Sequence, residues 1–128
     1  MKFDHLGIWV DDIESIRQFY VTYFNVVCSH KYFNPKRNFT SYFLSFQEGD
    51  GRIELMHIPD LLEPECREQM RGLAHFALST GSKEAVDVLT ERLRQDGYRV
   101  VGEPRTTGDG YYESVILDPE GNHIEIVA

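Results

Sequence analysis

Apolar residues in this chain recur with two different spacings. Residues 3–10 place branched aliphatic side chains at every second position, which predicts a strand. Apolar residues in the stretch 13–24 recur at every third or fourth position and predict an amphipathic helix. Asp11 is expected to cap this helix with Glu14 three residues on, and Asn25 is expected to end it in a left-handed conformation.

Three strand-like segments complete the first half of the chain. They cover residues 26–33, 39–46 and 52–58, which are rich in aromatic, aliphatic or β-branched side chains. Asn34-Pro35 and residues 48–51 supply the Asn, Pro, Gly and Asp side chains that favour turns between strands. The first half therefore predicts the element order β-α-β-β-β.

The second half repeats this order. Ser82 is positioned to cap its helix and Gly97 to end it. The expected elements are a strand over 72–79, a helix over 83–96, a strand over 98–102, a loop over 103–110, and strands over 111–117 and 123–127.

The pattern predicts an α+β fold of two tandem βαβββ modules with a mixed sheet. Residues 1–128 are expected to form one domain. Module 1 would cover about residues 1–58 and module 2 about residues 72–128. Residues 59–71 carry two prolines and mixed charge, and they are interpreted as the linker.

The last strand carries a carboxylate, Glu125, between Ile124 and Ile126. Neighbouring side chains of a strand point to opposite faces, so Glu125 is expected to point away from the core. A carboxylate held on a rigid strand needs a partner, commonly a cation or a metal. The first half ends in the same way, with Glu54 in the sequence Ile-Glu-Leu.

Each glutamate has a histidine at a matching distance. His5 and His75 lie 70 residues apart, Glu54 and Glu125 lie 71 apart, and each histidine precedes its glutamate by 49 or 50 residues. A single histidine or glutamate of a strand is more often structural or solvated, but four positions and two spacings together favour a pseudo-twofold site. Two imidazoles and two carboxylates suit a divalent ion such as Zn, Ni, Co, Mn or Fe, with positions left for a substrate oxygen.

Composition excludes several classes of function. Thirteen Lys and Arg against 21 Asp and Glu give a formal net charge of -8, which argues against a nucleic-acid surface and against docking on anionic lipid. Cys28 and Cys66 lack metal-site spacing and are expected to be reduced thiols. No apolar run approaches the ~20 residues of a membrane span, and no targeting segment is recognised, so a cytoplasmic location is expected.

The chain resembles the vicinal oxygen chelate superfamily, the glyoxalase/bleomycin-resistance/dioxygenase fold, over essentially its full length. The matching segments are residues 4–10, Phe19-Tyr20, residues 52–55, residues 73–78 and, most specifically, Asp118-Pro119-Glu120-Gly121-Asn122-His123-Ile124-Glu125. The resemblance implies paired βαβββ modules that each curl into half of a cup, with the metal between them.

The order His, Glu, His, Glu is most similar to glyoxalase I. By this resemblance His5, Glu54, His75 and Glu125 would ligate one divalent ion (Zn, Ni, Co, Mn or Fe). The implied activity is that of a lyase or isomerase on a small α-oxo or hemithioacetal substrate, through a metal-stabilised enediolate. Glu125, or else Glu54, would move the proton as the catalytic base. A homodimer that binds a small-molecule substrate, including a thiol adduct, is also implied.

Two positions depart from the glutathione-using members of that family. Trp9 and Ile58 stand where an arginine and an asparagine are expected. The resemblance therefore supports the metal ligands more strongly than it supports glutathione as a substrate.

Two other functions stay open beside the glyoxalase I hypothesis. One is another enzyme of the same fold, an Fe(II) dioxygenase, an epimerase or a thiol transferase. The other is a non-catalytic binding protein of the bleomycin-resistance kind. Four intact ligands favour the glyoxalase I hypothesis, although fold alone does not decide function.

A few further residues are candidates for substrate contact. Trp9 shares the face of His5 and would either line a pocket or fill a packing contact. Residues 106–112 would form a lip over the site or an ordinary exposed hairpin. Arg105 and Tyr112 are the substrate-contact candidates in and beside this loop.

Overall fold

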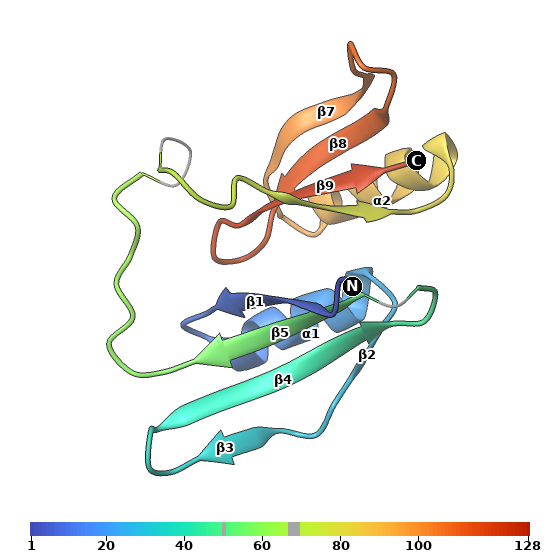
Figure 1. The fold of residues 1–128 in the computed structure, drawn as a ribbon. Helices are drawn as coiled ribbons and strands as arrows, with labels where there is room; N and C mark the ends of the chain where they lie inside the picture. The colour runs from blue at the N-terminus through green and yellow to red at the C-terminus, as the bar shows by residue number, and fades with distance from the viewer. Residues whose placement is uncertain (50, 67–69) are drawn as a thin grey trace. The chain divides into compact units, whose positions relative to one another are not determined.

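The structure is a computed structural model that describes residues 1–49, 51–66 and 70–128. It confirms the α+β class and the two tandem modules. The chain divides into two compact units, unit 1 over Met1–Glu63 and unit 2 over Pro64–Ala128. Each unit carries one helix against one sheet (Figure 1). The expectation of one domain with a linker over residues 59–71 stays a prediction.

Unit 1 is built on a sheet in the order β1-β5-β4-β2, with β3 also paired to β4. β1 and β5 are parallel, and β4 is antiparallel to its partners. The predicted strand over 26–33 is in fact two short strands. The elements are β1 His5–Trp9, α1 Ile13–Tyr23, β2 Val26–Cys28, β3 Tyr32–Asn34, β4 Phe39–Phe46 and β5 Arg52–His57.

Unit 2 has the sheet order β6-β9-β8-β7, with β6 parallel to β9. Its elements are β6 Phe76–Ser79, α2 Lys83–Gln95, β7 Val100–Thr106, β8 Tyr112–Leu117 and β9 His123–Val127.

Two strands of unit 2 differ most from their predicted bounds. The predicted strand over 72–79 is shorter, so that His75 immediately precedes β6. The predicted loop over 103–110 is wrong at its start, because β7 continues to Thr106. The pairing of β7 with β8 shifts register twice, and β7 is an edge strand, so irregular pairing accommodates Pro104 there.

The helix ends follow the predicted capping chemistry with one correction. Asp12, not Asp11, caps α1, because the helix begins at Ile13 and the Asp12 carboxylate accepts a hydrogen bond from the Ser15 amide at 3.0 Å. Asn25 has the expected left-handed backbone, with a φ of 49°. In unit 2, Ser82 caps α2 as predicted.

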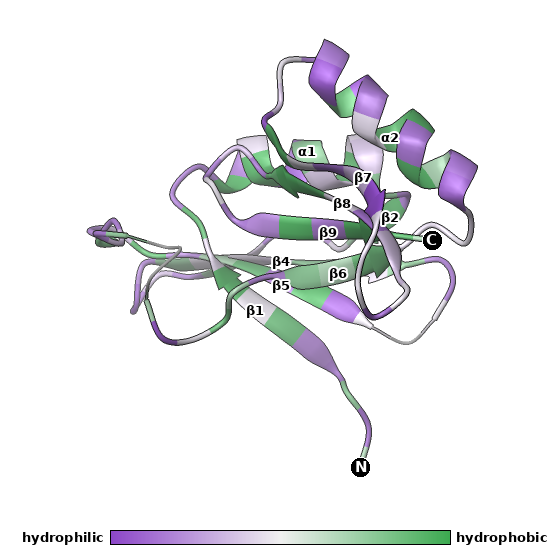
Figure 2. Ribbon diagram, turned by 90° about the horizontal axis from the view of Figure 1, so that it is seen from above, coloured by the Kyte–Doolittle hydropathy of each residue, from purple (hydrophilic) through white to green (hydrophobic). Residues whose placement is uncertain are grey.

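Each helix buries its apolar stripe against one face of its own sheet. Alternation along the strands supplies the matching apolar residues, as Figure 2 shows for β9, where hydrophobic and hydrophilic residues take turns. The helix-free face of each sheet is thereby left for polar side chains. The buried apolar side chains are Ile8, Val10, Ile13, Ile16, Phe19, Tyr20, Phe24, Val26, Tyr42, Leu44, Ile53 and Leu55 in unit 1, and Val86, Leu93, Ile116, Ile124 and Ile126 in unit 2.

The turn before β9 is held by one buried carboxylate. Asp118 accepts hydrogen bonds from the Glu120 amide at 3.0 Å, the Asn122 amide at 2.8 Å and the Asn122 side chain at 2.7 Å. Gly121 adopts a φ of 81°, a conformation that glycine reaches without strain. These contacts fix the point at which β9 begins.

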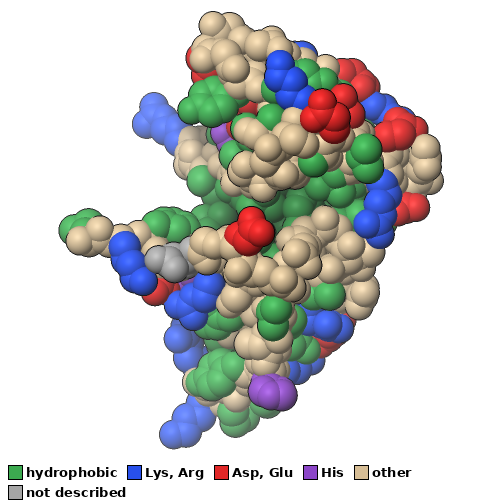
Figure 3. Space-filling view, turned by 90° about the vertical axis from the view of Figure 1, so that its right-hand side faces the viewer, with side chains coloured by type: hydrophobic (Ala, Val, Ile, Leu, Met, Phe, Trp, Pro, Cys, Tyr) green, Lys and Arg blue, Asp and Glu red, His purple; other side chains and the backbone are tan. Residues whose placement is uncertain are grey.

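The surface mixes charge types. On the face drawn in Figure 3, acidic and basic side chains are both scattered, with apolar side chains between them. Cys28 and Cys66 are free cysteines. None of the helices in the described part of the chain has the length and hydropathy needed to cross a membrane.

A cluster around Glu14 ties the first turn of α1 to the sheet of unit 1. Its carboxylate accepts hydrogen bonds from the Lys31 ammonium at 2.8 Å, the Tyr42 hydroxyl at 2.9 Å and the Arg17 guanidinium at 3.1 Å. The bond from Lys31, followed by those from Tyr42 and Arg17, outweighs burial and lowers the pKa of Glu14 from 4.5 to about 2.

We expect Glu14→Gln to lower the free energy of unfolding at pH 7 by about 1 kcal/mol, since the carboxylate is half exposed and solvent screens it. Because the folded pKa is depressed, the stabilisation is complete above the ordinary pKa of 4.5 and is lost as the pH falls towards 2. Urea unfolding between pH 7 and pH 2.5 would measure the difference in free energy of unfolding between the unchanged protein and Glu14→Gln, which should become smaller as the pH falls. Glu48→Gln, at an exposed residue, is the control and should change the free energy of unfolding very little. A difference for Glu14→Gln that stays constant with pH would show that the charge of the Glu14 carboxylate does not stabilise the fold.

Candidate functional site

In unit 1 the parallel pairing of β1 with β5 brings one predicted ligand pair together. Gly7 lies opposite Glu54 in the register, and His5 is two residues before Gly7 on the same helix-free face. The His5 Nε2 and Glu54 Oε2 atoms are 3.6 Å apart. The Glu54 side chain is 17 % exposed, so the carboxylate is held against the sheet rather than free in solvent.

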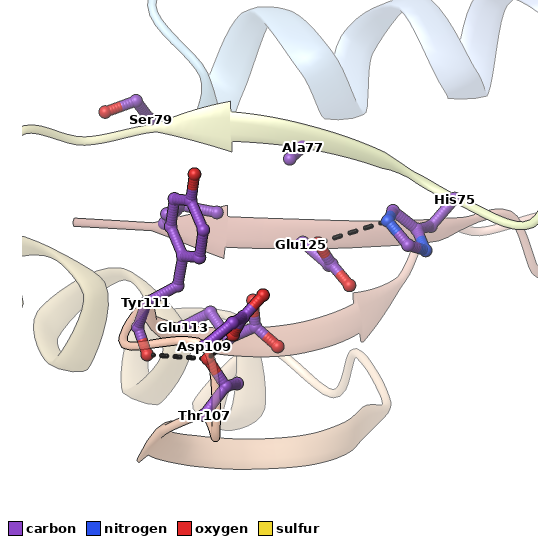
Figure 4. A pocket seen from close by; sticks show the side chains of 9 residues that line it. His75, Ala77, Ser79, Thr107, Asp109, Tyr111, Glu113 and Glu125 are labelled. Atoms are coloured by element: carbon purple, nitrogen blue, oxygen red, sulfur yellow. Dashed lines mark hydrogen bonds and ion pairs between the residues drawn. The ribbon is translucent and has the colours of Figure 1, made fainter.

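Unit 2 repeats the arrangement with β6 and β9. Ala77 lies opposite Glu125, and His75 is two residues before Ala77. The His75 Nε2 and Glu125 Oε2 atoms are 3.2 Å apart, and Figure 4 shows the two side chains pointing toward each other. The Glu125 side chain is 20 % exposed, close to the value for Glu54.

A small residue stands beside each glutamate on the neighbouring strand. At Gly7, a Cβ atom would lie 2.9 Å from the Met56 methyl group, so the position has no room for a side chain unless Met56 moves. Ala77 holds the equivalent place beside Glu125. The neighbouring strand therefore places little more than backbone beside each of the two carboxylates.

The imidazole of His5 is held by its surroundings. Its Nδ1 atom lies 2.8 Å from an Asp4 carboxylate oxygen, and the same oxygen accepts a hydrogen bond from Arg52. The Arg52 guanidinium stacks over the Phe43 ring at 4.6 Å, and the Phe43 ring contacts the His5 ring edge-on at 5.3 Å. The hydrogen bond with His5, followed by that from Arg52, lowers the pKa of the Asp4 carboxyl group.

This arrangement leaves the Nε2 atom of His5 facing Glu54. A proton on Nδ1, donated to Asp4, leaves a lone pair on Nε2, which is the form of imidazole that binds metals. In unit 2 the residue before His75 is Ala74, whose methyl side chain cannot accept a hydrogen bond from an imidazole. The two histidines therefore have different support.

The spacing of the donor atoms suits a shared metal ion. Two ligand bonds of about 2.1 Å that meet at about 90–110° place their donor atoms about 3.0–3.4 Å apart. The pair in unit 2, at 3.2 Å, lies within this interval, and the pair in unit 1, at 3.6 Å, lies slightly beyond it. Within the described residues, no three His, Cys, Asp or Glu side chains gather into a group that could hold an ion. Each pair is thus a two-donor fragment of the predicted set.

A cavity of about 540 Å³ lies on the helix-free face of unit 2, beside the His75–Glu125 pair (Figure 4). Carboxylates, hydroxyl groups and one aromatic ring line it together with small apolar side chains. The lining residues are His75, Ala77, Ser79, Thr107, Asp109, Tyr111, Glu113, Glu125 and Val127.

The structure changes which residues near the cavity are candidates. Tyr112, a predicted substrate contact, donates its hydroxyl to Asp87 of α2 at 2.7 Å and so lies on the helix side of the sheet. Its neighbour Tyr111 lines the cavity, because successive side chains alternate in direction. Arg105 does not line the cavity, but its Nη2 atom lies 3.5 Å from Oε1 of Glu113, and Glu113 does line it.

Ser79 and Glu113 were missed by the sequence reasoning. Alternation from His75 would have found Ser79, whereas Glu113 lies on β8 and only its pairing with β9 puts it on the face of Glu125. Residues Thr107, Asp109 and Tyr111 of the predicted lip line the cavity. Trp9 contacts the Phe39 ring edge-on at 6.2 Å, and it is half exposed on the face of His5.

Comparison with known proteins places these features in context. A sequence profile described as Glyoxalase/Bleomycin resistance protein/Dioxygenase superfamily matches residues 2–126. The uncharacterized protein YqjT of Bacillus subtilis (strain 168) is 30% identical over 128 residues, which cover 97% of this chain and 96% of that protein.

Two solved structures show the same fold. The glyoxalase family protein from Enterococcus faecalis superposes with a TM-score of 0.81 at 19% identity, over 99% of this chain and 97% of that one. The trypanothione-dependent glyoxalase I of Leishmania major superposes with a TM-score of 0.78 at 19% identity, over 99% of this chain and 86% of that one.

We expect Asp4→Asn to change the tautomer balance of His5, because a neutral amide is a weaker acceptor for Nδ1–H and can also donate to Nδ1. The ¹⁵N shifts of the ring should report a smaller share of the Nδ1–H form. His57, whose Nδ1 lies 2.9 Å from the Val10 carbonyl, is an internal reference that should not change. Asp60→Asn is the matched control in the same unit. An unchanged His5 spectrum would show that Asp4 does not hold the ring.

Proposed function

This chain belongs to the Glyoxalase/Bleomycin resistance protein/Dioxygenase superfamily, and we propose that it is a divalent-metal-dependent lyase or isomerase of the glyoxalase I type. Its substrate would be a small α-oxo compound or a hemithioacetal. The observation that carries the proposal is the equivalence of the two His–Glu pairs, each mounted on a parallel strand pair with its donor atoms at a spacing near that of shared ligands.

We propose that His5, Glu54, His75 and Glu125 together hold one ion, Zn, Ni, Co, Mn or Fe. Each unit contributes two donors, and the two units can belong to one chain or to two chains of a homodimer. The bound ion would supply a positive charge that stabilises the negative charge developing on adjacent substrate oxygens. The remaining chemistry is a proton transfer, which falls to the side chains of this chain.

Glu125 is our first candidate for the base, and Glu54 is the second. Glu125 lines the cavity, where a substrate carbon would lie within reach of its carboxylate, whereas Glu54 is not among the cavity residues. In the proposed reaction Glu125 takes a proton from the carbon next to the carbonyl and returns it to the adjacent carbon. His75, whose Nε2 atom lies 3.2 Å away, would take part as a ligand and not as a proton donor to Glu125.

Glutathione is not the thiol that we propose. The family resemblance places a cationic handle for its carboxylates at the position of Trp9 and an amide at that of Ile58, and neither side chain can serve those purposes. A different thiol, or a substrate with no thiol, fits these two positions better. The homodimer and the cytoplasmic location remain part of the proposal.

Metal titration tests the ligand set. Competition with a coloured chelator should give about one Zn²⁺, Ni²⁺ or Co²⁺ ion per chain. His5→Ala and His75→Ala should each weaken binding by more than about 100-fold, since loss of an outer partner of a ligand already costs about 10- to 100-fold. His30→Ala, at an exposed histidine outside the set, should bind normally. A chain that binds none of these ions at any loading would refute the metal site.

Glu125→Gln tests the base. In the metal-loaded protein, solvent proton exchange at the substrate carbon should fall by about 10²- to 10⁴-fold, which is the usual contribution of a general base. Glu54→Gln should reduce metal affinity more than it reduces exchange at saturating metal. A screen of methylglyoxal with several thiols would identify the assay substrate. Full exchange activity in Glu125→Gln would remove this residue from the mechanism.

A further inference from the structure

We propose that the cavity of unit 2 selects substrates that carry a cationic, ammonium-type group and disfavours anionic ones. The inference deepens the proposed function, on which it rests for the reaction, by naming the charge class of the substrate. It is carried by the charge of the cavity lining, by the burial of Glu113 and by the aromatic ring of Tyr111.

The lining of the cavity is acidic. Three of its nine residues carry carboxylates, Asp109, Glu113 and Glu125, and none is Lys or Arg. In Figure 4 these carboxylates and the Tyr111 ring lie around the same space on the helix-free face of the sheet. A cavity lined by charges of one sign concentrates ions of the other sign and repels its own.

Glu113 is the most buried carboxylate of the lining. The residue is 9 % exposed, and its polar partner among the described residues is the half-exposed Arg105 guanidinium, with Nη2 3.5 Å from Oε1. That distance is at the outer limit of a hydrogen bond, so the contact is a long one. An ammonium group in the cavity would give this carboxylate a second cationic partner.

The acidic groups remain available if the proposed metal is bound. Glu125 would then be a ligand, but Glu113 and Asp109 do not join the His75–Glu125 pair in a cluster of three potential ligands within the described part of the chain. Asp109 accepts a hydrogen bond from the Thr107 hydroxyl, which holds it at the cavity. Two carboxylates are thus left over for the substrate.

Tyr111 adds a second feature that favours a cation. Its ring is 59 % exposed and lines the cavity beside the carboxylates. The face of an aromatic ring attracts ammonium groups, and quaternary ammonium groups most characteristically. The hydroxyl groups of Ser79 and Thr107 complete a polar lining that has no fixed positive charge.

Binding can be tested on the metal-free protein with three thioethers of equal length. They are S-methylthiocholine, which is cationic, 2-(methylthio)ethanol, which is neutral, and 2-(methylthio)ethanesulfonate, which is anionic. NMR titration should give a dissociation constant about 10-fold lower for the cation than for the anion, a ratio typical of partly screened charge pairs. Equal affinity for all three, or tighter binding of the anion, would overturn the proposal.

Variants that remove one charge beside the cavity make this test more specific. Glu113→Gln should reduce the cation preference, and Arg105→Gln should increase it, because the two side chains oppose each other next to the cavity. Glu103→Gln makes the same change in net charge on the neighbouring strand, but Glu103 pairs with Arg94 of α2 and does not line the cavity. A preference that moves equally in Glu113→Gln and Glu103→Gln would reflect net charge and not the cavity.

Turnover separates this inference from the proposed function. The metal-loaded protein would be given hemithioacetals of methylglyoxal with thiocholine, 2-mercaptoethanol and 2-mercaptoethanesulfonate, and kcat/KM should fall in that order. Turnover without this order would overturn the charge selectivity and leave the lyase proposal standing. Charge-selective binding with no turnover of any of these substrates, or of methylglyoxal with other thiols, would overturn the lyase proposal and leave the selectivity standing.

Discussion

Pairing of two parallel strands is the constraint on which the candidate site depends in each unit. β1 beside β5, and β6 beside β9, bring together residues that are about 50 positions apart in the chain. The alternation of side chains then decides that a histidine and a glutamate share the helix-free face, while the flanking isoleucine and leucine residues enter the core. The same apolar pattern that stabilises each unit therefore orients its polar pair.

The two units share this plan but differ on their polar faces. In unit 1 the histidine is held by Asp4, Arg52 and Phe43, and aromatic rings continue along the face through Phe39. In unit 2 the residue before His75 is Ala74, and the face carries an acidic cavity. Under the proposed function, the first unit would hold its metal-binding histidine more firmly, and the second would receive the substrate. Repetition of the fold thus coexists with different side chains on the two helix-free faces.

Much of this could be predicted from the sequence, because helices and strands follow from local periodicity and the repeated His-to-Glu spacing gives the two halves equivalent polar positions. The two helices, the order of the elements and the approach of each histidine to its glutamate agree with the pattern. The pattern failed where long-range pairing overrides it. β7 extends through Pro104 because β8 offers an irregular partner. The predicted strand over 26–33 divides because residues 28–32 span one position more than residues 41–44 of β4, with which both of its parts pair.

Contacts between distant residues were also beyond the sequence. The support of His5 by Arg52 joins positions 47 residues apart through Asp4, and no periodicity in the chain records it. Whether Tyr111 or Tyr112 enters the cavity depends on which residue β8 aligns with β9, and only the register of the pair decides this. The union of the two pairs around one ion remains a prediction.

The length of the turn over residues 118–122 bears on which side chains of β9 face the candidate site. Its three hydrogen bonds enclose only the residues from Asp118 to Asn122, so that β9 can start at one place alone. If an insertion or deletion of one residue there shifted the pairing of β9 by one position, every side chain of the strand would change faces. An isoleucine would then stand beside His75, and Glu125 would face the core. The short turn over residues 118–122 thus helps to set the register in which β9 presents the Glu125 carboxylate.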